Sequence, residues 1–142
     1  VDTSALIDAL NLYLGIEQLR FGERLKIDFA VDDLASQGLV PSLILQPLIE
    51  NALKYAVAPR EEGGRLRIEG CVRGKTLGLA VQDDGPGLAP GMESGNGRGV
   101  GLRNTRERLA VLYSDHNCVT MRNSQPGLRI EITLPYERAA QL

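Results

Sequence analysis

The stretch Leu66–Val81, LRIEGCVRGKTLGLAV, decides the fold class of this chain. Apolar and polar residues alternate up to Val72, the pair Gly74-Lys75 has the composition of a turn, and the alternation resumes at Leu77. Successive side chains of a β-strand point to opposite faces of the sheet. The pattern therefore predicts a hairpin of two strands with one covered face.

The same alternation predicts three further strands, at residues 25–30, 119–121 and 128–134, and Pro135 ends the last of them. Because no strand is continuously apolar, we expect helices to bury one face of the sheet while solvent covers the other, which excludes a doubly wound parallel sheet. The expected fold class is α/β (α+β), a two-layer sandwich with a mixed, mostly antiparallel five-stranded sheet and helices on one face. Residues 1–142 are expected to form a single domain.

Helical spacing of apolar residues predicts the covering layer. A first helix is capped by Ser4 and runs to about Arg20, and a second covers Pro41–Tyr55. A third helix covers residues 102–113, with Leu102, Leu109 and Leu112 on its buried side.

Composition narrows the choice of partners. With 142 residues, a formal charge of −2 and only four Tyr and two Phe, the chain lacks the basic, aromatic surface of a nucleic-acid binder, so no nucleic-acid partner is expected. No apolar run approaches the roughly 20 residues of a membrane helix. The chain begins at Val1, so we expect a domain of a longer protein.

The two cysteines and the single histidine receive no catalytic role. Cys71 and Cys118 are expected to be reduced and to pack as small hydrophobes, with a disulfide as the less favoured alternative. His116 lies in a turn-rich tetrapeptide and is expected to be solvated. Two Cys and one His at unrelated spacings cannot form a structural zinc site.

The helix predicted over Pro41–Tyr55 gathers Glu50, Asn51 and Lys54 on one wall and apolar residues on the opposite half. The carboxylate can serve as a metal ligand or orient water, the neutral carboxamide can bind the metal, and the ammonium can balance phosphate charge, which are the groups that hold a magnesium nucleotide. The alternative is an ordinary amphipathic helix whose polar face is solvated.

Asp83 continues the alternation of the second hairpin strand, so its carboxylate is expected on the covered side of the sheet. A buried carboxylate requires hydrogen-bond donors, and the exocyclic amine of adenine is one such donor. Gly85 and Gly87 allow the backbone to approach a flat ligand. The alternative is a strand-end aspartate that turns the chain into Asp84-Gly85-Pro86-Gly87.

The segment Gly97–Leu102, GRGVGL, delivers three glycines at alternate positions onto the start of a helix. Free amides at a helix N-terminus bind phosphate, and Arg98 and Arg103 add positive charge. The segment matches neither a Walker P-loop nor a dinucleotide fingerprint. Residues 88–96 before it are small and polar and are interpreted as a lid over the phosphates, or alternatively as a plain surface loop.

In this order, the three features resemble the ATP-binding domain of sensor histidine kinases, within the gyrase, chaperone, kinase and mismatch-repair (GHKL) ATPase superfamily. The family's asparagine box resembles Leu45–Tyr55, its first glycine box Asp83–Gly87 and its second Gly97–Leu102. The resemblance implies the Bergerat ATP-binding fold.

The LytS-type subgroup gives the nearest resemblance. Its upstream pattern appears as Tyr13-Leu14, Ile16-Glu17 and Arg20-Phe21, and its extended second box as 101–109, GLRNTRERL. In this subgroup the phosphoacceptor histidine lies upstream of residue 1, so the resemblance implies that residues 1–22 link to a dimerisation and phosphoacceptor helix outside the chain.

The resemblance implies a role for each matching residue. Asn51 binds Mg²⁺, Lys54 and Tyr55 approach the phosphates or ribose, and Asp83 accepts from the adenine amine. Glu50 is a further candidate catalytic residue whose role is left open. The other residues expected to bind ATP lie in the two glycine boxes: Gly85, Gly87, Arg98, Gly99, Val100, Gly101 and Leu102.

Two departures from the family pattern affect the expected chemistry. The position of the water-activating glutamate of hydrolytic members is Pro47, which cannot act as a base, so phosphotransfer is favoured over ATP hydrolysis. Pro47 is also expected in the second turn of its helix, where it would bend the helix. Gly127 is followed by Leu128, whereas many relatives have threonine.

The sequence therefore predicts the catalytic domain of a bacterial sensor histidine kinase that uses ATP and Mg²⁺. The expected partners are its own phosphoacceptor helix and a response regulator, and the full-length protein is expected to be a homodimer. A cytoplasmic location is expected, with any membrane anchor outside the fragment. The isolated fragment is expected to bind ATP without autophosphorylating. The alternatives are a serine kinase of the anti-sigma type and a degenerate module without enzymatic activity.

Overall fold

The computed structural model describes residues 1–86, 100–113, 118–123 and 127–138, with residues 100–102 described by their backbone alone. A five-stranded sheet forms one layer, and its strand order is β1-β2-β3-β5-β4. β1 runs parallel to β2, and every other neighbouring pair is antiparallel. The strands are β1 (Leu25–Val31), β2 (Gly64–Arg73), β3 (Thr76–Asp83), β4 (Cys118–Asn123) and β5 (Leu128–Pro135).

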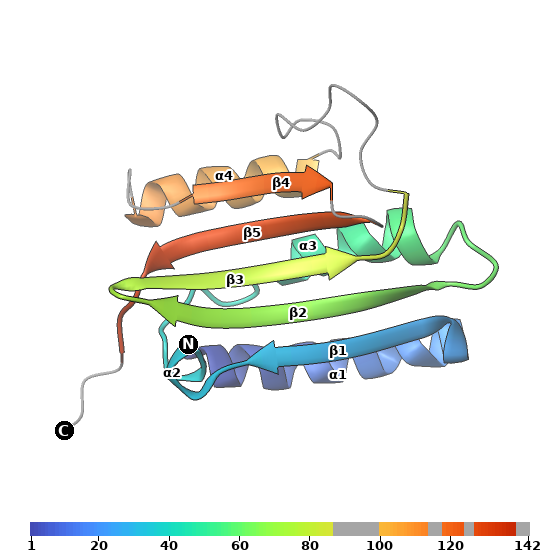
Figure 1. Cartoon of the computed structure of the whole chain (residues 1–142), viewed down its shortest axis with the longest axis horizontal. Helices are drawn as coiled ribbons and strands as arrows, with labels where there is room; N and C mark the ends of the chain where they lie inside the picture. The colour runs from blue at the N-terminus through green and yellow to red at the C-terminus, as the bar shows by residue number, and fades with distance from the viewer. Residues whose placement is uncertain (87–99, 114–117, 124–126, 139–142) are drawn as a thin grey trace.

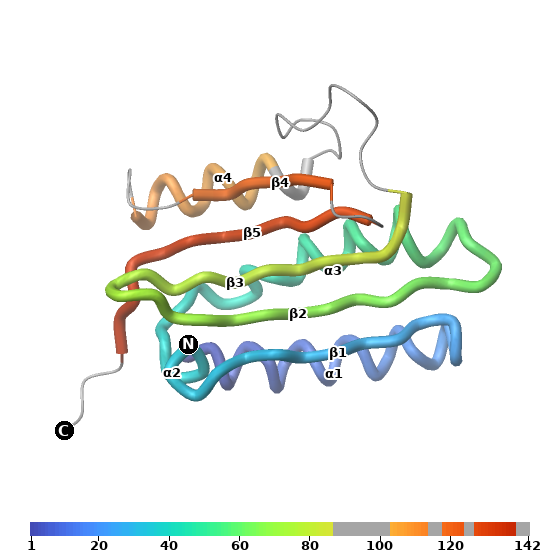
Figure 2. Tube along the Cα trace, viewed as in Figure 1, coloured from blue at the N-terminus to red at the C-terminus, as the bar shows by residue number. Residues whose placement is uncertain are grey.

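Helices cover one face of this sheet, as Figures 1 and 2 show. The described helices are α1 (Thr3–Phe21), α2 (Asp33–Ser36), α3 (Gln46–Ala52) and α4 (Val100–Tyr113), with a 3₁₀ turn η1 (Gly22–Arg24) and a π-helical turn η2 (Leu53–Val57). The predicted two-layer sandwich and the hairpin at Gly74-Lys75 are confirmed. Within the described ranges, no helix combines the length and apolar character needed to cross a bilayer.

The core lies between the two layers. The even-numbered residues of β2 face the helices, and Leu66 and Ile68 there are completely buried. α1 contributes Leu6, Leu10 and Leu14 to the same core. Burying each such side chain stabilises the fold by about 1.5–3 kcal/mol. Phe29, whose place in the alternation puts it on the same side as buried Leu25, lies on the edge strand β1 and is 37% exposed.

The cap predicted at Ser4 is wrong. The N-cap of α1 is Asp2, whose Oδ1 accepts a hydrogen bond from the Ala5 amide at 2.7 Å. Val40 N–H also donates to Val1 O, which fixes the chain just before the helix. An aspartate held in this position satisfies an amide that the first turn leaves without a partner.

The predicted helix over Pro41–Tyr55 is shorter than expected at its start. α3 begins at Gln46, and Leu43 before it has a positive φ of 61°, which a helix cannot contain. Pro47 therefore lies in the first turn, where no backbone N–H is needed, so the predicted bend at Pro47 is wrong.

The buried face of α4 also differs from the prediction. Thr105 and Leu109 are buried, four residues apart, and Tyr113 continues this row in a half-buried position. Leu112 falls beside the row and is 55% exposed, so its predicted burial is wrong. The helix starts at Val100, two residues earlier than predicted.

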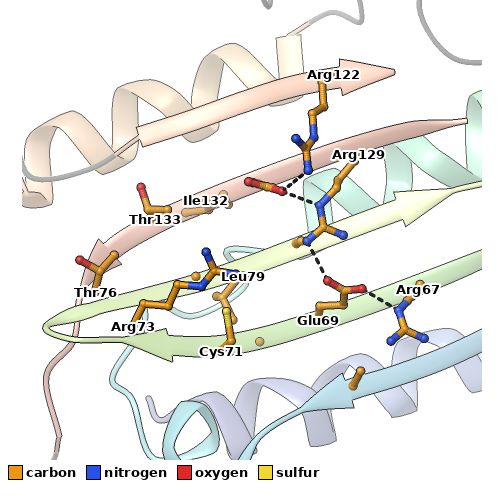
Figure 3. A pocket seen from close by; sticks show the side chains of 15 residues that line it. Arg67, Glu69, Cys71, Arg73, Thr76, Leu79, Arg122, Arg129, Ile132 and Thr133 are labelled. Carbon is orange, nitrogen blue, oxygen red and sulfur yellow. Dashed lines mark hydrogen bonds and ion pairs between the residues drawn. The ribbon is translucent and has the colours of Figure 1, made fainter. Parts of the chain in front are cut away.

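Arginine and glutamate side chains alternate across the open face of the sheet (Figure 3). Glu69 on β2 accepts from Arg67 at 2.6 Å and from Arg129 of β5 at 2.7 Å. Glu131 in turn accepts from Arg129 and from Arg122 of β4. The hydrogen bond from Arg129, followed by that from Arg67, holds the pKa of Glu69 below its usual value. The network joins three strands on the face that no helix covers.

Cys71 and Cys118 lie on this open face as free, exposed thiols, so their predicted role as packed hydrophobes is wrong. They occupy the ends of one cross-strand row that passes through Gly78 and Thr133. Three strand spacings separate their Cα atoms by about 14 Å. A disulfide requires less than about 7 Å, so the two thiols cannot form one within this chain.

Candidate functional site

Asn51 is a buried polar residue on the last turn of α3. It is 8% exposed, and its Nδ2 has no hydrogen-bond partner among the described residues. A buried amide without a partner costs about 1–3 kcal/mol relative to a satisfied one. Oxygen and nitrogen of a carboxamide are assigned from their hydrogen bonds, so a side chain without such bonds can present either atom. The position is suited to a ligand that supplies the missing interaction.

Asp83 lies at the end of β3 on the covered side of the sheet and is 4% exposed, as its place in the alternation predicts. Its Oδ1 accepts from the Gly85 amide at 3.0 Å and from the Leu128 amide at 3.3 Å. The carboxylate thus joins the end of β3 to the start of β5. The bond from the Gly85 amide is the one expected if Asp83 only turns the chain at the strand end. Asp83 is therefore both buried and part of this turn.

Gly127 permits this junction. Its φ is +104°, and a Cβ there would lie 1.7 Å from the carbonyl oxygen of Asp83. Only glycine fits such an approach. The start of β5 is thereby held against the end of β3, which places the Leu128 amide within reach of the carboxylate.

Gly85 brings the end of β3 against the helical layer. A Cβ at Gly85 would lie 2.6 Å from the Cβ and 2.9 Å from the Cα of Ala56. Ala56 belongs to η2, which continues α3 without a break. The contact therefore sets the helix of Asn51 against the strand end of Asp83.

Asp84 has a structural role next to this contact. Its Oδ1 accepts from the Arg65 amide at 2.9 Å and from Arg60 Nη1 at 3.2 Å, and Arg60 also donates to the Asp84 carbonyl. Arg24 Nη2 donates to the carbonyls of Arg60 and Val57. These bonds hold the loop after η2 and the strand end in a fixed relation, so the site rests on a rigid base.

Glu50 and Lys54 lie on another side of the helix from Asn51. Both are exposed and line a groove of about 290 Å³ with Tyr13 and Glu17 of α1. Gln46 donates to the Glu50 carboxylate at 3.2 Å. Lys54 Nζ lies 5.3 Å from the centroid of the half-buried Tyr55 ring, a cation–π distance. The polar wall predicted for this helix is therefore divided between a buried amide and an open groove.

Burial and the nearby carboxylates of Glu17 and Glu50 raise the pKa of Tyr13 to about 12. Glu17 Oε2 is buried and has no hydrogen-bond partner within the described ranges, although Arg20 Nη1 lies 3.8 Å away. The groove balances two carboxylates, Glu17 and Glu50, against two cations, Arg20 and Lys54.

Both glycine boxes, and the predicted lid at residues 88–96 between them, are described only in part or not at all. Gly87, Arg98 and Gly99 lie outside the described residues, as does His116. Val100, Gly101 and Leu102 form the first turn of α4, whose backbone amides have no partner within the helix. The described ranges contain no cluster of three or more His, Cys, Asp or Glu side chains arranged to hold a metal ion.

Sequence reasoning missed Thr105 and Ala56. Thr105 is a buried polar residue on α4, and its spacing of four from Leu109 could have revealed its face. Ala56 could have been found from its small size opposite a glycine, but only after the strand end was placed against the helix.

A buried carboxamide and a buried carboxylate thus lie on adjoining elements of a two-layer sandwich. The chain belongs to the family of histidine kinase-, DNA gyrase B- and HSP90-like ATPases, which matches residues 39–138.

Individual proteins agree with this assignment. The chain is 37% identical over 130 residues to the sensor histidine kinase YesM of Bacillus subtilis, covering 90% of the chain and 22% of YesM. It is 28% identical over 138 residues to the sensor protein LytS of Staphylococcus epidermidis, covering 91% of the chain and 23% of LytS. The chain thus spans less than a quarter of these two relatives.

Among solved structures, the catalytic domain of the histidine kinase ThkA superposes with a TM-score of 0.80 at 14% sequence identity. The superposition covers 98% of this chain and 97% of the ThkA catalytic-domain chain. At this identity the likeness establishes the fold, and it confirms the predicted fold class.

Proposed function

We propose that this chain is the ATP-binding catalytic domain of a two-component sensor histidine kinase of the LytS type. The observation that carries the proposal is the unpartnered buried amide of Asn51, held next to the end of β3 by the contact between Gly85 and Ala56. Membership of the ATPase family and the similarity to a sensor histidine kinase support it.

Asn51 fits a magnesium ion because an amide oxygen is a neutral, hard ligand and this amide lacks a partner within the described ranges. Bound there with the nucleotide, Mg²⁺ would supply positive charge to the phosphate oxygens. Magnesium commonly takes only one or two protein ligands and completes its shell with phosphate and water, so a single carboxamide suffices.

Asp83 is proposed to select adenine. Two backbone amides fix its Oδ1, so the orientation of the carboxylate is set before a base arrives. A fixed acceptor favours the exocyclic amine of adenine over the carbonyl that guanine carries at the same position. Gly85 and Gly87 are proposed to lie beside the base.

The phosphates are proposed to lie toward the N-terminus of α4, whose free amides and dipole favour anions. Lys54 and Tyr55 approach the phosphates or ribose from η2. Glu50 is retained as a candidate catalytic residue, with its carboxylate positioned by Gln46. The remaining proposed contacts are those of the second glycine box: Arg98, Gly99, Val100, Gly101 and Leu102.

Transfer to a protein histidine is favoured over hydrolysis. Pro47 occupies the position of the water-activating residue and has no group that can accept a proton. The acceptor is proposed to be a histidine on a dimerisation helix outside this chain, from which a response-regulator aspartate receives the phosphoryl group. The full-length protein would be a bacterial sensor kinase that acts as a homodimer with its catalytic domain in the cytoplasm.

Incubation of the full-length protein with radiolabelled ATP tests this proposal. Phosphate that is stable in alkali but lost in acid indicates phosphohistidine, and Asn51→Ala should remove the label. An acid-stable label would contradict transfer to histidine.

A degenerate module remains the second candidate function because of Leu128. Its side chain is 1% exposed and packs in the core, so it supplies no hydroxyl near Asp83. Full-length protein that binds ATP but labels neither itself nor a serine of an added partner protein would favour this candidate.

A further inference from the structure

Arg24, the last residue of η1, reaches the end of the helix that carries Asn51. Its Nη2 donates to the carbonyl oxygens of Val57 and Ala58 at 3.3 Å and of Arg60 at 2.6 Å. Arg24 precedes β1 and Val57 ends η2, so the first of these bonds spans 33 positions of sequence. A single side chain thus collects three carbonyls where the helix ends.

The end of η2 needs such a partner. The last carbonyls of a helix have no amide donor within the helix, and many helices satisfy them by ending at a glycine with a positive φ. The residue after η2 is Ala58, whose φ is −61°, so the chain does not form that cap. Arg24 takes its place, and its positive charge suits the negative end of the helix dipole.

The backbone of Arg24 is fixed by a second contact with the same loop. Gly63 has a φ of +78°, and a Cβ there would lie 2.0 Å from the Arg24 carbonyl oxygen and 2.5 Å from the Arg24 Cβ. Only glycine permits this approach. The Gly63 amide also donates to the Arg60 carbonyl at 3.0 Å, the oxygen that Arg24 binds. Main chain and side chain of Arg24 are therefore both anchored to the loop that follows η2.

The guanidinium of Arg24 carries a cost that a purely stabilising residue would avoid. Its Nε is buried and has no hydrogen-bond partner among the described residues. An unpaired buried donor lowers stability, and more so on a charged group. The Cζ atom lies over the Phe21 ring, 5.7 Å from the centroid, which offsets part of this cost. Departures of this kind concentrate at functional sites, which favours a role beyond stability.

A π-helical turn lies between Asn51 and the carbonyls that Arg24 holds. The Ala58 amide donates at 2.8 Å to the carbonyl of Leu53, where an α-helix would use that of Lys54. π-Helical turns are rare and are frequent at functional sites. Relaxation to an α-helix would rotate the two sides of the turn against each other by about one residue step, 100°. Arg24 binds at the exit of the turn and therefore opposes this rotation.

The loop that Arg24 anchors also reaches the strand end of Asp83. The Arg60 guanidinium donates to the Asp84 carbonyl at 2.9 Å and to the Asp84 carboxylate at 3.2 Å. Asn51 lies on the other side of the anchor, about 9 Å along the helix axis from Val57. One residue outside the site thus restrains both elements that form it.

We propose that Arg24 is a positioning residue for nucleotide binding. Its bonds to the end of η2 fix the rotation of α3 about its axis, and with it the position of the Asn51 amide relative to Asp83. Arg24 acts through the helix and is not proposed to touch the nucleotide. The proposal rests on the proposed function of Asn51 and Asp83, so its first test does not use nucleotide.

Hydrogen exchange of the chain without nucleotide tests the restraint itself. Arg24→Met keeps an apolar stem over Phe21 but removes the three hydrogen bonds. The amides of residues 50–58 should exchange about tenfold faster, beyond any change in the amides of β5, because the opening is local. Arg122→Met is the matched control, since Arg122 pairs with Glu131 on the open face and makes no contact with the helix end. Unchanged exchange over residues 50–58 in Arg24→Met would overturn the proposal.

Calorimetric titration with a non-hydrolysable ATP analogue, with and without Mg²⁺, tests the consequence for binding. Arg24→Met, under conditions where circular dichroism shows it fully folded, should bind the magnesium complex about tenfold more weakly. The loss without magnesium should be smaller, because the displaced group is the metal ligand Asn51. Arg24→Lys keeps the charge and should have an affinity between those of Arg24→Met and the unmodified chain. Arg122→Met should bind normally.

The two experiments separate this proposal from the proposed function. If the unmodified chain bound no nucleotide, the proposed function would fail, and hydrogen exchange would still decide whether Arg24 restrains α3. If the unmodified chain bound nucleotide and Arg24→Met bound it equally, with the same dependence on magnesium, the positioning role would be refuted while the proposed function stood. If Arg24→Met did not fold, Arg24→Lys would serve for both comparisons.

Discussion

Replacing Gly85 with alanine tests whether the contact between β3 and η2 holds the site together. The added Cβ would lie 2.6 Å from the Cβ of Ala56 and 2.9 Å from its Cα. Carbon atoms pack at about 3.5–4.0 Å, so the strand end and the helix must separate by about 1 Å. Neither of these Ala56 atoms can move aside, because the residue is completely buried in η2 and has no flexible side chain.

Overpacking of this size costs about 1–3 kcal/mol of the free energy of unfolding. Urea unfolding followed by circular dichroism measures it, with the m-value showing whether unfolding stays two-state. Gly78→Ala is the matched control, since its Cβ would meet only Cys71, at 3.7 Å and beyond. That substitution should be neutral or stabilise by up to about 1 kcal/mol.

The displacement should also reach Asn51, because η2 continues α3. We expect Gly85→Ala to weaken nucleotide binding by more than the loss of stability explains, under conditions where the variant is fully folded. Adding Ala56→Gly removes the nearest atom, so the double variant should be more stable than the sum of the two single changes predicts. If Gly85→Ala were as stable as Gly78→Ala and bound nucleotide normally, the reasoning about this contact would be refuted.

Two further predictions concern buried and paired polar groups. Asn51→Leu replaces an amide that has no partner within the described ranges by an apolar side chain of similar size. The protein without nucleotide should become more stable by up to about 1 kcal/mol, and it should lose magnesium-dependent nucleotide affinity. A lower free energy of unfolding in urea would contradict this account. Arg129→Met should cost about 1 kcal/mol at pH 7. Because the pKa of Glu69 is lowered in the fold, its stabilisation is complete above the usual value of 4.5 and is lost as pH falls through the lowered folded pKa. The difference between wild type and Arg129→Met in urea should therefore shrink at pH 3, and a constant difference would show that the ion pairs contribute nothing.

The strand pattern made most of the fold predictable. Alternation around Gly74-Lys75 identified the hairpin and the face on which Asp83 lies, because side chains point alternately to the two faces up to the last residue of a strand. The same parity shows that Cys71 shares a face with Arg67 and Glu69, so its exposure was readable from the sequence although it was not predicted.

Helix boundaries were less predictable because more than one residue near each helix end can serve as its cap or first residue. Asp2 and Ser4 can both cap a helix, and the choice depends on the contact of residue 1 with Val40, far along the chain. The start of α3 depends on the positive φ of Leu43, for which leucine gives no local signal. α2 was not predicted, although Asp32 caps it by accepting from the Ala35 amide.

The site was predictable in its residue types but not in its geometry. Helical periodicity placed Asn51 with Glu50 and Lys54, whereas packing buries the amide and leaves the other two in a groove facing α1. Periodicity gives angles around a helix axis, but only the neighbouring elements decide which angle is buried. The contact of Gly85 with Ala56 joins residues 29 positions apart in sequence, so no local pattern contains it.

Calorimetric titration of residues 1–142 with a non-hydrolysable ATP analogue is the most direct test of the central claim, that Asn51 and Asp83 form an adenine nucleotide site. The account predicts binding that requires Mg²⁺, a clear preference over the corresponding GTP analogue, and loss of that preference in Asp83→Asn. Absence of binding at millimolar nucleotide, or equal binding of both analogues without magnesium, would contradict it.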